Sequence, residues 1–180
     1  MNEEPVALVI GGTGMLRPAV RTLLDRGRDV AVIARRPDRG APATATDGRF
    51  LPVPGNWSEP SSLADDVLAA TGGRRATTVI AWVHTPHRRA VMEGLEDAIA
   101  VEADVIHLWG SASLDPRGTI EEIDPGKGRR ALHVLLGYQR DAPGARWLTS
   151  EEVSAAAVSA LDEGTSGIVA GQLDPWDGRP

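Results

Sequence analysis

Three glycines near the start of the chain, Gly11, Gly12 and Gly14, are the first residues whose type and spacing suggest a chemistry. They follow the apolar run 6–10 and stand directly before an amphipathic segment. Glycines at such a place let the backbone turn sharply and approach a pyrophosphate, while free N–H groups at the start of the next helix hold the anion. We therefore predict a dinucleotide-binding turn, with a purely structural glycine turn as the alternative. The residues predicted to contact the dinucleotide here are Gly11, Gly12, Thr13, Gly14, Met15, Leu16 and Arg17.

Arginines near this turn bear on which dinucleotide is bound. Arg17 stands where many such turns carry a third glycine, so either the helix stands off the strand or Arg17 reaches toward a phosphate. The second expected strand, 30–34, is followed by Arg35 and Arg36, where an acidic residue would hold the ribose hydroxyls of NAD. Arginine at this place can pair with a 2′-phosphate. We therefore predict a preference for NADP(H) over NAD(H), with solvated arginines at a loop mouth as the alternative.

Two further pairs of residues follow expected strands and should lie at the same edge of the sheet. Asn56 and Trp57 come after the strand 50–53 and are expected to border the adenine. Ala81 and Trp82 belong to the strand 77–83 and are also predicted to contact the cofactor. Half-buried packing is the alternative for Trp57. An aromatic substrate pocket and simple packing remain equal alternatives for Trp82.

His84, at the carboxyl end of the strand 77–83, is the candidate for acid–base chemistry. Histidine titrates near neutrality and could exchange a proton with a substrate while a hydride moves to or from the cofactor. The alternative is a histidine that binds backbone at a strand end. His84 and His87 form an H-x-x-H pair, but no carboxylate or cysteine stands near them in sequence, so we predict no metal site.

The elements that must position these residues alternate between strands and helices. Further strands are expected at 104–109, 131–138 and 167–171, with helices at 16–27, 62–72, 87–101 and 149–161. Capping boxes are expected at Ser62 with Asp65 and at Thr149 with Glu152. The pattern predicts one doubly wound α/β (Rossmann) domain over residues 1–180. Its sheet is expected to be mostly parallel, with six or seven strands in an order like 3-2-1-4-5-6.

Composition excludes several classes of function. A net charge of −6 and a pI near 5.2 argue against a general nucleic-acid or anionic-membrane binder. The chain has no cysteine, so disulfides and thiolate chemistry are excluded. No apolar run approaches the roughly 20 residues of a membrane span. The acidic start MNEEP leads directly into the first strand and leaves no room for a signal peptide, so we expect a cytoplasmic protein.

The segments GGTGML and VIARRP resemble the short-chain dehydrogenase/reductase superfamily, and in particular its atypical, NmrA-like side. The segments AWVH, WLTSEEVS and PWDGRP are similar to small bacterial proteins of that kind, so the resemblance covers nearly the whole chain. It implies a Rossmann fold and a nicotinamide dinucleotide cofactor. It does not indicate a substrate.

The resemblance also implies a serine after the fifth strand and a Tyr–Lys pair on the next helix. Ser111 stands at the serine position, with Ser113 as its rival. The only tyrosine, Tyr138, is on an expected strand and is followed four residues later by alanine, and the only lysine, Lys127, has no tyrosine before it. The sequence therefore excludes the usual Ser-Tyr-Lys arrangement.

Two functions remain. The first is an NADP(H)-dependent oxidoreductase that transfers hydride with a small organic carbonyl or imine, using Ser111 and His84. The second is a non-catalytic NADP(H)-binding sensor or scaffold, which the NmrA-like resemblance allows. A second copy of the chain could close a shallow site, with contacts from the tail around Trp176.

Overall fold

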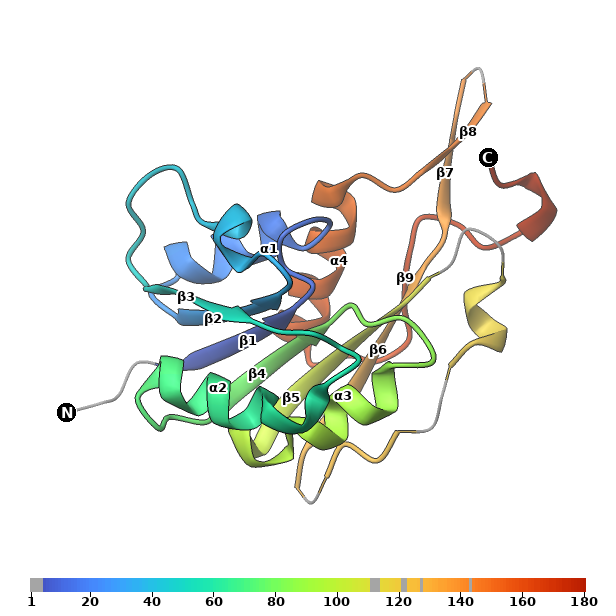
Figure 1. Ribbon diagram of the computed structural model, residues 1–180. Coiled ribbons are helices and arrows are strands. Elements are labelled where there is room, and N and C mark those ends of the chain that lie inside the picture. The colour runs from blue at the N-terminus through green and yellow to red at the C-terminus, as the bar shows by residue number, and fades with distance from the viewer. Residues whose placement is uncertain (1–4, 111–113, 121–122, 127, 143) are drawn as a thin grey trace.

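The central sheet is built from short apolar runs that alternate along the chain with helices. The computed structural model describes residues 5–110, 114–120, 123–126, 128–142 and 144–180. In it, parallel strands form one sheet in the order β3-β2-β1-β4-β5-β6-β9 (Figure 1). They are β1 (Val6–Ile10), β2 (Asp29–Ala34), β3 (Phe50–Pro54), β4 (Ala76–Ala81), β5 (Ile99–Trp109), β6 (Arg130–Leu136) and β9 (Ile168–Ala170). The predicted α/β class and strand order are confirmed, with β9 added at the far edge.

Helices cover both faces of this sheet, with α1 and α4 on one face and α2 and α3 on the other (Figure 1). Their bounds are α1 (Arg17–Asp25), α2 (Leu63–Thr71), α3 (Arg88–Gly94) and α4 (Ser150–Glu163). Alternate residues of β1 face the two layers: Val9 packs toward α1 and α4, whereas Leu8 and Ile10 pack toward α2 and α3. Because both faces are covered, β1 at the centre of the sheet is apolar throughout. Among the described residues, every helix falls short of the length and apolarity that a membrane span requires.

Short elements connect and extend this framework. The 3₁₀ helices of the described part are η1 (Pro37–Gly40), η2 (Pro60–Ser62), η3 (Glu96–Ala98), η4 (Pro116–Gly118) and η5 (Trp176–Gly178). An antiparallel pair, β7 (Tyr138–Asp141) and β8 (Gly144–Trp147), extends away from the body of the domain (Figure 1). In η5, the ring of Trp176 lies 6.4 Å from that of Tyr138 and 6.3 Å from that of Trp147. The tail therefore folds onto the strand pair of its own chain.

The third helix is shorter than its sequence pattern predicts. The apolar spacing through Ala98 indicates a helix to residue 101, but α3 ends at Gly94 and β5 begins at Ile99, which pairs with Ala76 of β4. A Cβ atom on Gly94 would lie 2.4 Å from the carbonyl oxygen of Pro60, so the chain makes a close backbone contact there. Pairing with β4 then takes up residues that the helical pattern alone would assign to α3.

The sixth strand also ends earlier than expected. β6 stops at Leu136, and Tyr138 begins β7 instead of ending β6. Gly137 separates the two, and a Cβ atom there would lie 2.1 Å from the carbonyl oxygen of Gln172. The backbone of residues 137–138 bonds to residues 170–172, which turns the chain out of the sheet.

One of the two predicted capping boxes is present. The Thr149 hydroxyl accepts from the Glu152 N–H at 3.2 Å, and the Glu152 carboxylate accepts from the Thr149 N–H at 2.8 Å. The box expected at Ser62 is wrong, because Ser62 has helical backbone angles and its hydroxyl donates to Asp66. A residue in that conformation continues η2 into α2, so its side chain does not cap the helix.

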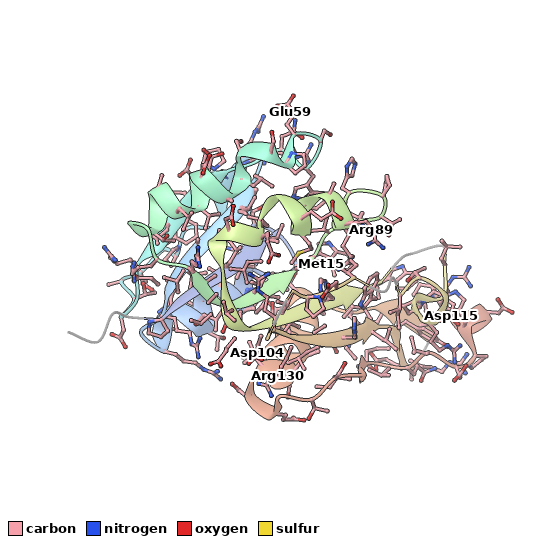
Figure 2. The ribbon with its side chains drawn as sticks, turned by 90° about the horizontal axis from the view of Figure 1, so that it is seen from below. Met15, Glu59, Arg89, Asp104, Asp115 and Arg130 are labelled. Carbon is pink, nitrogen blue, oxygen red and sulfur yellow. The ribbon has the colours of Figure 1, made fainter. Side chains whose placement is uncertain are left out.

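The amino edge of the sheet carries paired charges. The Asp29 carboxylate, 2% exposed, accepts hydrogen bonds from the guanidinium groups of Arg49 and Arg74, both at 2.6 Å. We call these three residues the amino-edge ion cluster. Burial alone would raise the pKa of Asp29, but the two arginines outweigh it and lower the pKa to about 2. Asp104 and Arg130 form a second pair, at 2.6 Å (Figure 2).

Candidate functional site

The turn after β1 requires glycine at two positions. Gly11 has φ +85°, and a Cβ atom there would lie 2.9 Å from the carbonyl oxygen of Trp82. A Cβ atom on Gly12 would lie 2.9 Å from the side chain of Val32, so this residue faces the core. Gly14, in contrast, has nothing within 4 Å of its Cβ position. The turn is therefore packed from below and open on the side of Gly14.

The N–H groups of this turn are available to a ligand. Within the described part of the chain, the backbone N–H groups of Thr13, Gly14 and Met15 have no acceptor. They precede α1, whose N-terminal end carries the positive end of the helix dipole. The carbonyl of Met15 accepts from the hydroxyl of Ser154 in α4 at 2.8 Å, which fixes the turn from behind. The arrangement suits an anion such as a pyrophosphate.

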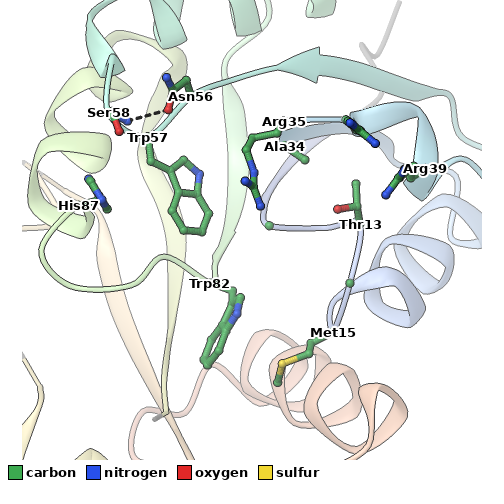
Figure 3. Close-up of a pocket in the computed structure, with 13 residues that line it drawn as sticks. Thr13, Met15, Ala34, Arg35, Arg39, Asn56, Trp57, Ser58, Trp82 and His87 are labelled. Carbon is green, nitrogen blue, oxygen red and sulfur yellow. Dashed lines mark hydrogen bonds between the residues drawn. The ribbon is translucent and has the colours of Figure 1, made fainter. Parts of the chain in front are cut away.

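The turn forms one wall of a groove of about 830 Å³ at the carboxyl edge of the sheet (Figure 3). The loops after β1, β2, β3 and β4 all contribute to it, as expected for a doubly wound sheet. Its volume lies in the range of roughly 300–1,000 Å³ that is typical of small-molecule sites. The lining residues are Gly11, Thr13, Gly14, Met15, Ala34, Arg35, Arg36, Arg39, Asn56, Trp57, Ser58, Trp82 and His87.

Three arginines line this groove: Arg35, Arg36 and Arg39, which we call the groove arginines. All three are exposed, and none of their guanidinium groups has a hydrogen-bond or ion-pair partner among the described residues. Arg35 and Arg36 were expected from the sequence. Arg39 lies in η1 and was missed, although the spacing R-R-x-x-R was a visible signal. Three cations without partners beside one groove favour an anionic ligand.

Aromatic side chains make up another part of the wall. Figure 3 shows the indoles of Trp57 and Trp82 turned into the groove, with His87 near Trp57. The ring of His84 lies 5.0 Å from that of Trp82 and 6.2 Å from that of Trp57, but His84 is exposed and does not line the groove. His87, which begins the segment leading into α3, is thus a lining residue that the sequence analysis did not choose.

Several predicted residues lie outside the groove lining. Gly12 and Leu16 face the core below the turn, and Ala81 is fully buried in β4. Arg17 is exposed and borders a separate, smaller groove of about 190 Å³ between α1 and the loop after η1. Ser111 lies outside the described residues. Gly12, Leu16 and Ala81 are thus part of the core beneath the groove, and Arg17 stands beside it.

Tyr138 lies outside the groove and packs against the tail. Its side chain is buried, and its hydroxyl donates to the carbonyl oxygen of Pro175 at 2.5 Å. The Tyr138 hydroxyl oxygen in turn accepts from the side-chain amide of Gln172 at 3.0 Å. Tyr138 therefore holds the tail against β7, and it is not among the groove residues.

A buried polar group lies behind α3. The Arg88 guanidinium donates to the Leu108 carbonyl at 2.6 Å, contacts Nδ1 of His107 at 3.3 Å and stands 3.9 Å above the Trp109 ring. The Trp109 indole donates to Nδ1 of His133 at 2.9 Å. Burial, followed by the charge of Arg88, lowers the pKa of His107 to about 3, and the same two causes lower the pKa of His133. Both histidines are therefore neutral near pH 7.

No group of three or more His, Cys, Asp or Glu side chains within the described residues is placed to hold a metal ion. The polar groups of the groove residues are backbone N–H groups, guanidinium groups, the amide of Asn56, the hydroxyls of Thr13 and Ser58, and the imidazole of His87. Such groups donate hydrogen bonds to anions and to ribose.

No protein-family model matches the sequence, and a search among curated proteins returned no match. Solved structures do match. A double variant of a Serratia marcescens short-chain dehydrogenase/reductase is 16% identical, with TM-score 0.65 over 93% of this chain and 96% of that one. A Sphingobium yanoikuyae short-chain dehydrogenase in complex with NADPH is 16% identical, with TM-score 0.63 over 96% and 91%.

A metagenomic short-chain oxidoreductase in complex with NADP is 15% identical, with TM-score 0.57 over 93% of this chain and 95% of that one. At sequence identities this low, the structural match establishes the fold and leaves the activity open. The chain therefore has the Rossmann fold that these short-chain dehydrogenase/reductase structures share.

Proposed function

We propose that the chain binds NADP(H) in the groove at the carboxyl edge and acts as an oxidoreductase on a small organic carbonyl or imine. The observation that carries the proposal is the pairing of an open glycine turn with the groove arginines. The N–H groups of Thr13, Gly14 and Met15 suit the pyrophosphate, and the groove arginines suit the 2′-phosphate that distinguishes NADP from NAD. Solved structures of the same fold that hold NADP or NADPH support the choice of ligand.

The residues present fit such a cofactor. The groove is large enough for an extended molecule, Gly14 leaves open space beside the turn, and Asn56 and Trp57 follow β3, where the adenine is expected. When bound, the nicotinamide ring supplies the hydride chemistry. The part of this chain is to hold the phosphates, orient the rings and exchange a proton with the substrate.

A histidine is the group of this chain best suited to proton exchange. His87 lines the groove, whereas His84 stands at its outer rim against Trp82. We propose that one of these two histidines exchanges the proton, with Ser111 as a further polar group. The two histidines are distinguished by changing each to alanine. NADPH oxidation by each variant is then measured with a panel of small carbonyl and imine compounds. Replacing the catalytic histidine should lower the rate of NADPH oxidation by about 100-fold, and replacing the other histidine should lower it by less than about threefold.

The second candidate function is a non-catalytic NADP(H)-binding sensor or scaffold of the NmrA-like kind. Tyr138 favours it, because the only tyrosine of the chain is buried in a contact with Pro175 and cannot serve a substrate in the groove. This candidate predicts tight binding of both oxidised and reduced cofactor without turnover of any compound in the same panel.

Calorimetric titration tests the cofactor assignment. Wild-type protein should bind NADP⁺ more tightly than NAD⁺, and Arg35→Asp should weaken NADP⁺ binding by about 10- to 100-fold, because a charge-assisted hydrogen bond contributes about 1.5–3 kcal/mol. The matched control is Arg75→Asp, which makes the same charge change at an exposed arginine after α2, at the opposite edge. Unchanged NADP⁺ affinity in Arg35→Asp would refute the preference for NADP(H).

A further inference from the structure

The groove has two chemically different ends. The groove arginines, Asn56 and Ser58 give one end a cationic and polar character, whereas Met15 and Trp82 lie together at the other end (Figure 3). Thr13 and the open side of the glycine turn lie between them. An NADP molecule with its 2′-phosphate at the arginines and its pyrophosphate at the turn would therefore extend its nicotinamide half toward Trp82.

Trp82 is held firmly at that end. The backbone N–H of Trp82 donates to the backbone carbonyl of Ile10 at 3.1 Å. This hydrogen bond continues the pairing of β4 with β1 beyond Ala81. At one end of the indole, Cδ1 lies 3.5 Å from the Cβ position of Gly11, and at the other end Cη2 lies 3.3 Å from that of Gly110. The indole thus crosses the carboxyl edge from the end of β1 to the end of β5. His84 contacts it edge-on, with ring planes at 71°.

An indole in this place suits one part of the cofactor above the others. The oxidised nicotinamide ring is planar and positively charged, and tryptophan is the best aromatic partner for a cation. Stacking of a planar heterocycle on an aromatic side chain also tolerates changes in its substituents. Phosphates and ribose, in contrast, gain nothing from an apolar ring face.

We infer that the indole of Trp82 is the surface against which the nicotinamide ring of NADP(H) stacks. The inference rests on the proposed function and adds a positioning residue to it. Trp82 holds the ring at the end of β4, next to His84 and in the same groove as His87, the two histidines from which proton exchange is proposed. The contacts with the glycine turn and with the chain after β5 keep the indole in place before the ligand arrives, which limits the ordering cost of binding.

Binding of two ligands by the full chain tests this inference. NADP⁺ contains the nicotinamide ring, whereas adenosine 2′,5′-bisphosphate keeps the 2′-phosphate and lacks that ring. Both ligands are titrated into the wild type and into the variants Trp82→Ala and Trp82→Phe. We expect Trp82→Ala to weaken NADP⁺ binding by about 10-fold. Its affinity for the bisphosphate should stay within about twofold, and Trp82→Phe should lie between wild type and Trp82→Ala for NADP⁺.

A spectroscopic readout accompanies the titration. An indole stacked on oxidised nicotinamide should give a broad charge-transfer absorption at wavelengths longer than those of either ring alone. The band should be present in wild type and absent in Trp82→Ala. Trp147→Ala is the matched control, because Trp147 is an exposed tryptophan of β8 outside the groove lining, and it should keep both the band and the affinity.

Equal weakening of both ligands in Trp82→Ala would overturn the inference, since it would mean that Trp82 only shapes the groove. Unchanged NADP⁺ affinity would overturn it as well. In either case, binding of both ligands by wild type would leave the proposed cofactor site standing. Wild-type protein that binds neither ligand would overturn the inference together with the proposed function.

Discussion

The arginines at the two edges of the sheet differ in what surrounds them. At the amino edge, Arg49 and Arg74 both donate to Asp29, a carboxylate that is almost fully buried. At the carboxyl edge, the groove arginines stand close together in the chain and have no partner among the described residues. The residue type is the same, but the first set completes a contact within the fold and the second leaves its charges open to solvent and to the groove.

This difference separates arginines that are held within the fold from arginines that are open to a ligand in the groove. A buried carboxylate that loses its arginines leaves an uncompensated charge, so the amino-edge ion cluster contributes to stability. Cations placed near one another without counter-charges repel, and they add little to the stability of the folded chain. Their placement beside an open glycine turn is what the proposed binding of NADP(H) requires.

The largest effect on stability is expected at the amino edge. Asp29→Ala removes the acceptor of both arginine side chains and of the Arg49 N–H. We expect the free energy of unfolding to fall by about 3 kcal/mol, which corresponds to a decrease in Tm of about 6 to 12 °C. Thermal unfolding measures this, and NADP⁺ affinity of the folded variant should be unchanged. A weaker affinity would break the separation between the two edges.

Arg88 sharpens the comparison, because it lies near the carboxyl half of the sheet and yet belongs to the fold. Burial, and after it the charge of Arg88, keeps His107 neutral in the native state, with a pKa of about 3 against 6.5 in the unfolded chain. Between these values the unfolded chain binds a proton that the native protein does not. Stability therefore falls as the pH falls from about 6.5 toward 3.

At pH 5 the loss from His107 should amount to about 2 kcal/mol relative to pH 8. Asp29 adds to the loss only at lower pH, since its pKa shifts from 3.8 to about 2. Urea unfolding of wild type and His107→Leu between pH 8 and 5 checks this expectation. The free energy of unfolding should change less with pH in the variant than in the wild type. An equal change in both proteins would show that His107 is not the cause.

The smallest effect is expected for a single member of the groove arginines. Arg39→Ala should weaken NADP⁺ binding by about 10-fold, because Arg35 and Arg36 remain. This loss lies near the lower end of the contribution of a charge-assisted hydrogen bond. NAD⁺ affinity and Tm should change little, since the side chain is exposed and makes no contact that the fold needs. A fall in Tm comparable to that of Asp29→Ala would show that the two sets of arginines do not differ in kind.

Much of the fold could be predicted from local sequence. The apolar runs at 6–10 and 77–83 became β1 and β4, and the box at Thr149 with Glu152 caps α4. These signals are local, because strand periodicity and capping depend on residues close in the chain. Apart from the capping box at Ser62, the predictions that were wrong concern boundaries, such as the end of α3 at Gly94, where contact with Pro60 and pairing with β4 decide.

The candidate site was predictable to a different degree at each of its parts. The sequence predicted the glycines of the turn, and the structure requires glycine at Gly11 by its positive φ and at Gly12 by a close contact with Val32. Arg39 and His87 were missed, because neither ends a strand and their place beside the groove depends on how η1 and the segment before α3 fold back.

The sequence by itself determined the doubly wound α/β fold, its strand order and the glycine turn after β1. Each of these depends on residue type and short-range spacing. Only the tertiary structure decided which arginines are paired, that Tyr138 is bound to the tail, and that the indole of Trp82 crosses the carboxyl edge. The physical reason is distance along the chain: Asp29 meets Arg74, and Trp82 meets Gly110, only after the sheet has brought separate strands together.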